Sequence, residues 1–162
     1  EQAWDQLKTF LRTAGDVIQG TNLQKAWFKP DLLLKDLNGG KGIPEGRFKI
    51  TDSDGVASVF DFRTAVPKTV GELITKINDA AVGVTASINA TGDGLLLTDT
   101  AGGPLQMAVE EVDNGTVAKA LNILGDAPLG TQVIDGRLEK TVEILATDTL
   151  SSVQTKINDL GW

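Results

Sequence analysis

Apolar residues at helical spacing mark the segment 69–79 as an amphipathic helix. Four of them recur every three or four positions: Val70, Leu73, Ile74 and Ile77. Thr69 stands at the N-cap position and Glu72 follows three residues later, which is the order of a capping box. We therefore expect a capped helix over 69–79 whose apolar face packs against a core.

The same pattern returns near the end of the chain. The block Thr-Lys-Ile-Asn-Asp occupies 75–79 and again 155–159, an offset of 155 − 75 = 80 residues. The second apolar face consists of Leu150, Val153, Ile157 and Leu160. Thr149 holds the cap position, but the short side chain of Ser152 is expected to return the capping bond less well than Glu72. A second core-packed helix is predicted.

The repeat extends upstream of both helices. Three pairs share an offset of 121 − 37 = 84 residues: Leu37-Asn38 with Leu121-Asn122, Gly46 with Gly130, and Ile50 with Ile134. The turn Asp52–Gly55 shortens to Asp135-Gly136 in the second copy. Each copy thus contains a short apolar stretch, a glycine-rich loop, a hairpin and a helix. Repeats shorter than a domain are typical of modular chains.

Two runs of residues that are typical of β-strands follow the first helix. Val84–Ile88 and 95–98 flank a Gly/Asp/Asn turn and predict a β-hairpin. Residues 105–112 form a third strand candidate, which ends at the tight-turn dipeptide Asn114-Gly115. The second copy has no comparable strands before Trp162. We therefore expect an excised piece of a longer protein, whose second unit is cut.

These elements define an α+β fold with an N-terminal helix. Two related units are expected, each a helix packed on a small, mainly antiparallel sheet. The predicted divisions are an N-terminal helical segment at 1–30, a complete unit at 31–115 and a truncated unit at 116–162.

The N-terminal segment has its own apolar periodicity. Its residues are spaced by three and four positions: Trp4, Leu7, Leu11, Ala14 and Ile18. The seam covers about two heptads and Gly15 interrupts it, whereas coiled coils are inferred from longer runs. The segment is either a surface helix on its own domain or part of a stalk or bundle. Pro30 would end a helix that arrives from Ala26–Phe28.

Composition narrows the classes of function. The 162 residues include 15 basic and 22 acidic side chains, a net charge of −7, which disfavours nucleic acid as a partner. Cysteine and histidine are absent, so thiolate metal sites, Cys nucleophiles and histidine bases are excluded. No apolar run approaches the roughly 20 residues of a transmembrane helix, so no membrane insertion is expected.

Three loops resemble binding motifs, but each lacks residues that its motif requires. The loop 38–42 has Gly42 where a phosphate loop needs Ser or Thr after lysine, so a flexible turn is favoured. The turn Asp52–Gly55 lacks the glycine and glutamate of a calcium loop at positions 6 and 12, which favours a β-turn. Asp93 and Asp99 could join a β-roll calcium site, but the nine-residue iteration is missing.

Acidic and asparagine motifs are no more specific. A cluster of Glu110, Glu111 and Asp113 offers paired carboxylates without a defined cleft. Asn89 and Asn114 match the N-glycosylation pattern, and turn chemistry explains both. No catalytic, cofactor-binding or metal-binding residue is predicted, and we expect that the protein is not an enzyme.

The repeat carries a resemblance to a known family. Residues 69–78, then Gly83–Asn89 and Gly92–Gly103, resemble the hook IN motif of bacterial flagellins and flagellar hook-associated proteins. Residues 142–158 resemble the first half of that motif. The resemblance is strongest to the filament-cap family, hook-associated protein 2.

The resemblance implies a structural role. It implies a surface-exposed module of an extracellular flagellar axial protein, in particular of the filament cap, with flagellin and other axial proteins as partners. Homo-oligomers would form through regions outside this chain, so the chain alone is expected to be monomeric or weakly associating.

Two alternatives stay open. The chain could be an outer domain of a flagellin or of hook-associated protein 1 or 3. It could also be a surface adhesin that recognises glycans or host protein. In that case the hairpin near Asp93-Gly94 and an exposed Trp27 are the places to look.

Overall fold

A computed structural model of the chain describes residues 27–137, 142–145 and 147–159. These residues belong to two compact units, one formed by 27–137 and the other containing 142–159. Each unit is described by itself. The predicted heptad positions Trp4 to Ile18 lie outside the described residues, as do all but the last four residues of the predicted segment 1–30.

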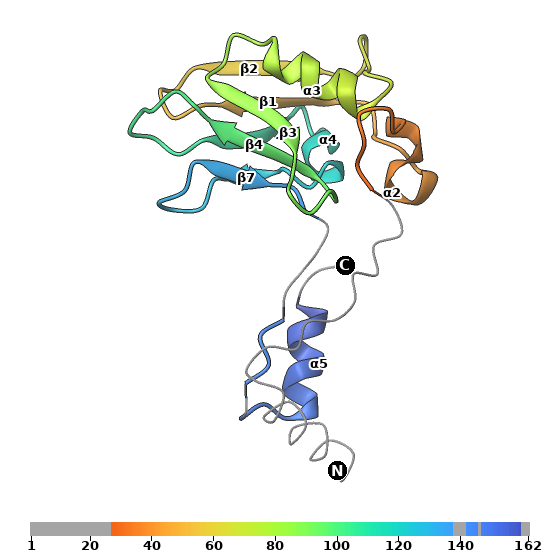
Figure 1. The fold of residues 1–162 in the computed structure, drawn as a ribbon, viewed down its shortest axis with the longest axis vertical. Helices are drawn as coiled ribbons and strands as arrows, with labels where there is room; N and C mark the ends of the chain where they lie inside the picture. The colour runs from red at the N-terminus through yellow and green to blue at the C-terminus, as the bar shows by residue number, and fades with distance from the viewer. Residues whose placement is uncertain (1–26, 138–141, 146, 160–162) are drawn as a thin grey trace. The chain divides into compact units, whose positions relative to one another are not determined.

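A four-stranded antiparallel sheet forms one layer of the unit 27–137 (Figure 1). Its strand order is β2-β1-β5-β6, with bounds β2 (Ala57–Asp61), β1 (Arg47–Thr51), β5 (Ala108–Val112) and β6 (Gly125–Asp126). Burial alternates along β1, where Phe48 and Ile50 are fully buried. That alternation is expected for a sheet with one face on the core. The predicted third strand begins at Ala108, three residues after Leu105.

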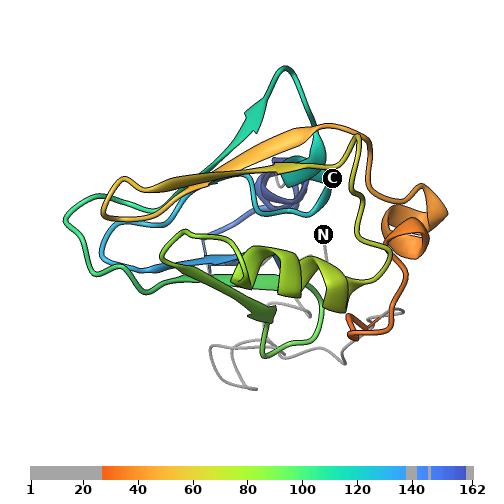
Figure 2. The same ribbon diagram turned by 90° about the horizontal axis from the view of Figure 1, so that it is seen from above.

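A three-stranded antiparallel sheet forms the second layer. Its order is β3-β4-β7, with bounds β3 (Val84–Ile88), β4 (Leu95–Asp99) and β7 (Val133–Asp135). Val84 pairs with Asp99 and Ile88 with Leu95, which confirms the predicted hairpin. Figure 2 shows this sheet and the four-stranded sheet as separate layers, with α3 (Val70–Asn78) alongside.

Helix α3 buries the face that the sequence predicted. Val70, Leu73 and Ile77 are fully buried, and Ile74 is partly buried against the same core. The remaining helical pieces of this unit are short: η1 (Leu34–Asp36), α2 (Leu37–Gly40) and α4 (Val117–Ala120). Together with the two sheets they confirm the α+β class.

Aromatic rings fill the centre of the four-stranded sheet. Phe48 stacks on Phe60 with ring centroids 5.0 Å apart and meets Phe62 edge-on at 5.7 Å. All three rings are buried in one continuous core that also takes in side chains of α3 and the second sheet. The two sheets and α3 therefore fold around a common core.

The second predicted helix forms, but its apolar face is largely exposed. Helix α5 (Leu150–Asn158) buries Val153, whereas Leu150 is 63% and Ile157 45% exposed. Leu160 lies outside the described residues. No strand occurs in 142–145 or 147–159, so α5 lacks there the sheet that covers α3. The expectation of a core-packed face was therefore wrong for Leu150 and Ile157.

The compact unit crosses the boundary predicted between 115 and 116. Strand β6 pairs with β5, and β7 pairs with β4, so residues 125–135 complete the sheets of the first repeat. The upstream correspondence of the repeats is visible in the backbone, because Asn38 and Asn122 both have positive φ, 53° and 58°. That residues 116–162 are a truncated second copy stays a prediction.

Truncating the central aromatic ring is expected to destabilise the unit 27–137 strongly. Phe48→Ala removes a fully buried ring and leaves a cavity, which typically costs about 3–5 kcal/mol of unfolding free energy. Val59→Ala on the exposed face of β2 is the control and should change stability by less than about 0.5 kcal/mol. Urea unfolding of the full chain measures both. Equal effects of the two substitutions would contradict the assignment of the core.

Candidate functional site

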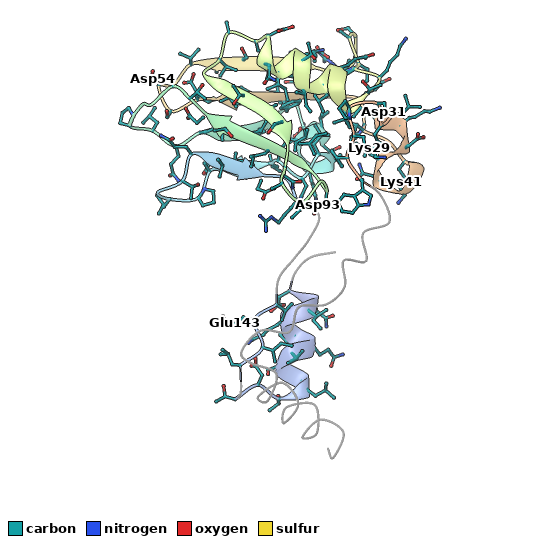
Figure 3. All side chains as sticks on the ribbon, viewed as in Figure 1. Lys29, Asp31, Lys41, Asp54, Asp93 and Glu143 are labelled. Carbon is teal, nitrogen blue, oxygen red and sulfur yellow. The ribbon has the colours of Figure 1, made fainter. Side chains whose placement is uncertain are left out.

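Four of the residues singled out in the sequence lie at the two ends of β4 in the unit 27–137: Asp52 and Asp99 at one end, and Asn89 and Asp93 at the other. We call the Asp99 end of β4 the distal end and the Leu95 end the proximal end. At the proximal end Phe28 donates a backbone hydrogen bond to Gly92, and Gly136 donates one to Leu95. The two ends of the described part of this unit thus lie together there. Figure 3 labels Asp54 at the distal end and Asp93 at the proximal end.

Asp52 organises the turn between β1 and β2. One carboxylate oxygen, Oδ1, accepts from the backbone N–H groups of Asp54 at 3.0 Å and Val56 at 2.9 Å. The other oxygen accepts from the N–H of Gly83 at 2.8 Å, just before β3. The side chain is buried and acts as a turn residue, as predicted, and it also ties the first hairpin to the second sheet.

Asp99 completes this buried polar network at the end of β4. Its Oδ2 accepts from Ser53 N at 2.7 Å, and its Oδ1 accepts from the Ser53 hydroxyl at 3.1 Å and Ala101 N at 2.8 Å. These protein donors occupy the oxygens that a cation would need. Within the described residues, no three His, Cys, Asp or Glu side chains are grouped to hold a metal ion.

Asp93 belongs to a different network at the proximal end. Asn89 Nδ2 donates to Asp93 Oδ1 at 2.8 Å and to Asp135 Oδ1 at 2.9 Å, and the Thr91 hydroxyl also donates to Asp93. Asp93 and Asp99 therefore do not converge on one site. Asn89 is buried in this network, so its role is structural, as the turn interpretation predicted.

The acidic cluster disperses into separate structural contacts. Glu110 pairs with Lys49 at 2.7 Å across the sheet, and Asp113 pairs with Arg47. Glu111 accepts from the N–H groups of Val117 at 3.1 Å and Lys119 at 2.8 Å, which ties its carboxylate to the first turn of α4. The three carboxylates share no ligand position.

The glycine-rich loop 38–42 closes on itself. Asn38 Nδ2 donates to the carbonyls of Gly42 at 3.0 Å and Ala120 at 3.1 Å. Asn38 and the glycines at 39, 40 and 42 all have positive φ. The loop is a turn, as predicted, and its asparagine fastens it to the end of α4. Asn114 also has positive φ, 57°, in the turn that ends β5.

The two repeated helices begin with different capping arrangements. In α3 the Thr69 hydroxyl accepts from Glu72 N at 3.1 Å, while Glu72 reaches past Thr69 to the N–H of Lys68 at 2.7 Å. In α5 the exchange is complete, because Ser152 Oγ accepts from Thr149 N at 2.9 Å and Ser152 N donates to Thr149 Oγ1 at 3.1 Å. The expectation that Ser152 returns the bond less well was wrong.

The repeated lysine anchors each helix to the chain before it. Lys76 Nζ donates to the carbonyl of Ala65 at 2.5 Å, and Lys156 Nζ donates to that of Glu143 at 2.8 Å. Lys156 also pairs with Asp148 at 2.6 Å. That bond, with further donors from Leu145 N–H and the Ser152 hydroxyl, lowers the pKa of Asp148.

The repeated asparagine has a partner in the first copy. Asn78 Oδ1 accepts from Ala86 N at 2.6 Å, and its Nδ2 donates to Ala86 O at 3.1 Å. The side-chain amide thus makes the same pair of hydrogen bonds with the backbone of β3 that a neighbouring strand would make. These two bonds fix the end of α3 to β3. Asn158, its counterpart, is exposed.

Sequence reasoning missed an open groove at the distal end. The groove has a volume of about 500 Å³ and lies between the segments 103–107 and 129–132. Leu105 and Leu129 line it and are 60% and 86% exposed. The dipeptides Pro104-Leu105 and Pro128-Leu129 are the sequence signal that could have indicated the groove. Proline favours a turn, so the leucine that follows it lies in a loop and can be exposed.

Trp27 lies at the proximal hairpin that the sequence named. Its side chain is 49% exposed, and a Cβ added to Gly92 would come within 2.8 Å of the indole ring. The indole therefore packs on the β3–β4 turn beside Asp93-Gly94. The two features proposed for an adhesin surface are brought together.

Comparison with known proteins identifies a family motif within this unit. Residues 47–101 match the family model described as the flagellin hook IN motif. The match spans β1 to β4 and α3, about a third of the 162 residues. It supports a relationship to flagellins and flagellar axial proteins for this segment. No curated protein and no solved structure matches the chain.

Of the helices in the described ranges, none has the length and apolar character to cross a membrane.

The identical Thr-Lys-Ile-Asn-Asp blocks allow a matched stability test. Asn78→Ala leaves the buried backbone groups of Ala86 without partners and is expected to cost about 1–3 kcal/mol of unfolding free energy. Asn158→Ala, in the same local sequence but exposed, should cost less than about 0.5 kcal/mol. Urea denaturation of the full chain followed by far-UV circular dichroism, which detects α3 and α5 in their separate units, measures both. Similar losses would show that the block stabilises both helices in the same way.

Proposed function

We propose that the chain is a structural, surface-exposed module of a bacterial flagellar axial protein, in particular of the filament cap that helps flagellin assemble at the tip. The observation that carries the proposal is the match of residues 47–101 to the flagellin hook IN motif. The match covers two hairpins and the helix between them, which together form the centre of the unit 27–137.

The internal bonding of the unit supports a mechanical role. The Asp52–Ser53–Asp99 network joins the two sheets at the distal end, and Asn89 joins the β3–β4 turn to β7 at the proximal end. Satisfied buried polar networks hold a fold in one arrangement. A module that guides incoming subunits benefits from such a fixed surface.

The same contacts support a non-enzymatic role. The carboxylate oxygens of Asp52, Asp99 and Glu111 accept hydrogen bonds from backbone and hydroxyl donors, and these bonds hold turns and the start of a helix. A general acid or base needs a carboxylate free to meet a substrate. We propose that no catalytic step takes place on this module.

Flagellin and the other axial proteins are the proposed partners, outside the cell. Homo-oligomers would be made by regions beyond this chain. The net charge of −7 is consistent with a module that stays soluble and does not associate with itself.

Localisation on the flagellum tests the proposal. Antibody raised against the 162-residue chain should label the filament tip in immunogold electron microscopy of flagellated cells of the source bacterium. Labelling along the whole filament would instead assign the chain to a flagellin. Labelling at the hook–filament junction would assign it to another hook-associated protein, and cells deleted for the gene give the background.

A glycan-binding role is the second candidate, favoured by the position of Trp27. An exposed indole beside a hairpin turn is a surface on which a sugar ring could stack. If the role is correct, the full chain binds members of a glycan array and Trp27→Ala loses at least about tenfold in affinity, because the stacking surface is removed. An array without hits would remove this candidate and leave the flagellar proposal in place.

A further inference from the structure

We propose that the distal groove binds a protein segment that presents an aliphatic side chain flanked by lysine or arginine. The groove is the space between 103–107 and 129–132 described above. This inference concerns the surface of the unit itself and goes beyond the proposed place of the module in the flagellum.

Two exposed aliphatic side chains from separate loops line the groove, and the β1–β2 turn lies beside one of them. Leu105 and Leu129 both line the groove, one from each of its two segments. A Cβ added to Gly55 would lie 3.6 Å from Leu105 Cδ1, so the β1–β2 turn lies beside Leu105. Single exposed aliphatic residues are ordinary on protein surfaces, whereas a group of them around a concavity indicates a binding site.

Backbone hydrogen bonds hold the two walls in place. Leu105 N donates to Ser53 O at 3.0 Å, and Gly103 N donates to the Ser53 hydroxyl at 2.8 Å. Ala127 N donates to Met107 O at 2.8 Å, just before the second wall. Met107 and Asp99, which also line the groove, are buried.

The second wall is a closed turn. Thr131 N donates to Pro128 O at 2.9 Å, and Gly130 takes the positive φ, 76°, that such a turn requires. Leu129 is therefore presented to solvent on a defined turn. A preorganised groove of this kind loses little conformational entropy when a ligand binds.

The charge around the groove selects the partner. The loops 52–56, 99–107 and 124–132 contain aspartates and no lysine or arginine. Asp54 is exposed, and its carboxylate lies against Gly103, because a Cβ there would collide with it. Asp126 is exposed on β6. A basic segment is attracted to this rim, whereas a second copy of the chain, with the same acidic rim and a net charge of −7, is repelled.

The groove and the residues Phe28 and Gly136 lie at opposite ends of the β3–β4 hairpin. Asp99 lines the groove, while Phe28 and Gly136 are bonded to the opposite end of the β3–β4 hairpin. Figure 3 shows Asp54 at the end away from Asp93 and Lys29.

The test is an NMR titration of the ¹⁵N-labelled 162-residue chain with two designed peptides. The first alternates leucine with lysine over five residues between terminal glycines, and the second replaces each lysine with glutamate. We expect the basic peptide to shift the amide signals of Leu105 and Leu129 and to bind at least about tenfold more tightly than the acidic one. Asp54→Asn should weaken the basic peptide and reduce its salt dependence.

Matched variants separate binding at the groove from nonspecific attraction. Leu129→Ser is expected to lower the affinity on the order of tenfold, the value of one well-buried leucine contact. Val66→Ser removes an exposed aliphatic residue in the loop after β2 and should leave the affinity unchanged. Amide spectra of both variants verify the fold. Absence of shifts, equal affinity for the two peptides, or equal effects of the two variants would overturn the proposal.

Discussion

The buried hydrogen bonds of Asp52 and Asp99 are the constraint on which the distal half of the unit 27–137 depends. Burying a carboxylate is costly unless donors replace its water, and here each carboxylate receives three donors from neighbouring turns. Through Gly83 and Ser53 these bonds connect the β1–β2 turn to both strands of the β3–β4 hairpin. The connection ties the two sheets together at one end of the apolar core that they share. The first wall of the groove follows from it as well, since Ser53 also holds Gly103 and Leu105.

The two identical copies of the Thr-Lys-Ile-Asn-Asp block make some of the same contacts and differ in others. Local features repeat, because the capped start and the lysine that reaches back to a carbonyl depend on residues within about fifteen positions. The role of the asparagine does not repeat, because it depends on a strand that follows the helix. Asn78 has β3 as its partner, and Asn158 is exposed. The repeat therefore reports shared local chemistry, while the tertiary surroundings decide how much stability each residue contributes.

Elements with strong local signals could be predicted from the sequence, and elements that depend on distant partners could not. Helix α3, the β3–β4 hairpin and the turn at Asp52 have caps, periodicity and turn residues of their own. The exposed face of α5 could not be foreseen, because periodicity shows which residues are apolar and not whether a sheet covers them. The pairing of β7 with β4 could not be predicted, because the repeat pairs Ile134 with Ile50 and gives no signal of a contact with β4. The groove could not be predicted either, because its two walls precede β5 and β7, which belong to different sheets.

The segment that matches the hook IN motif does not include all the strands that stabilise it. Residues 47–101 supply the hairpins β1–β2 and β3–β4, and an isolated two-stranded hairpin is marginally stable in water. Strands β5 and β7, both outside the match, pair with β1 and β4 and extend each hairpin into a sheet. The same outer segments provide Leu105 and Leu129 and most of the groove. The motif is thus a scaffold whose sheets are completed by residues 108–135, and most of the distal groove is formed by residues 103–107 and 129–132, which also lie outside the match. Specificity for a partner is then a property of the added segments, which a match to the motif does not reveal.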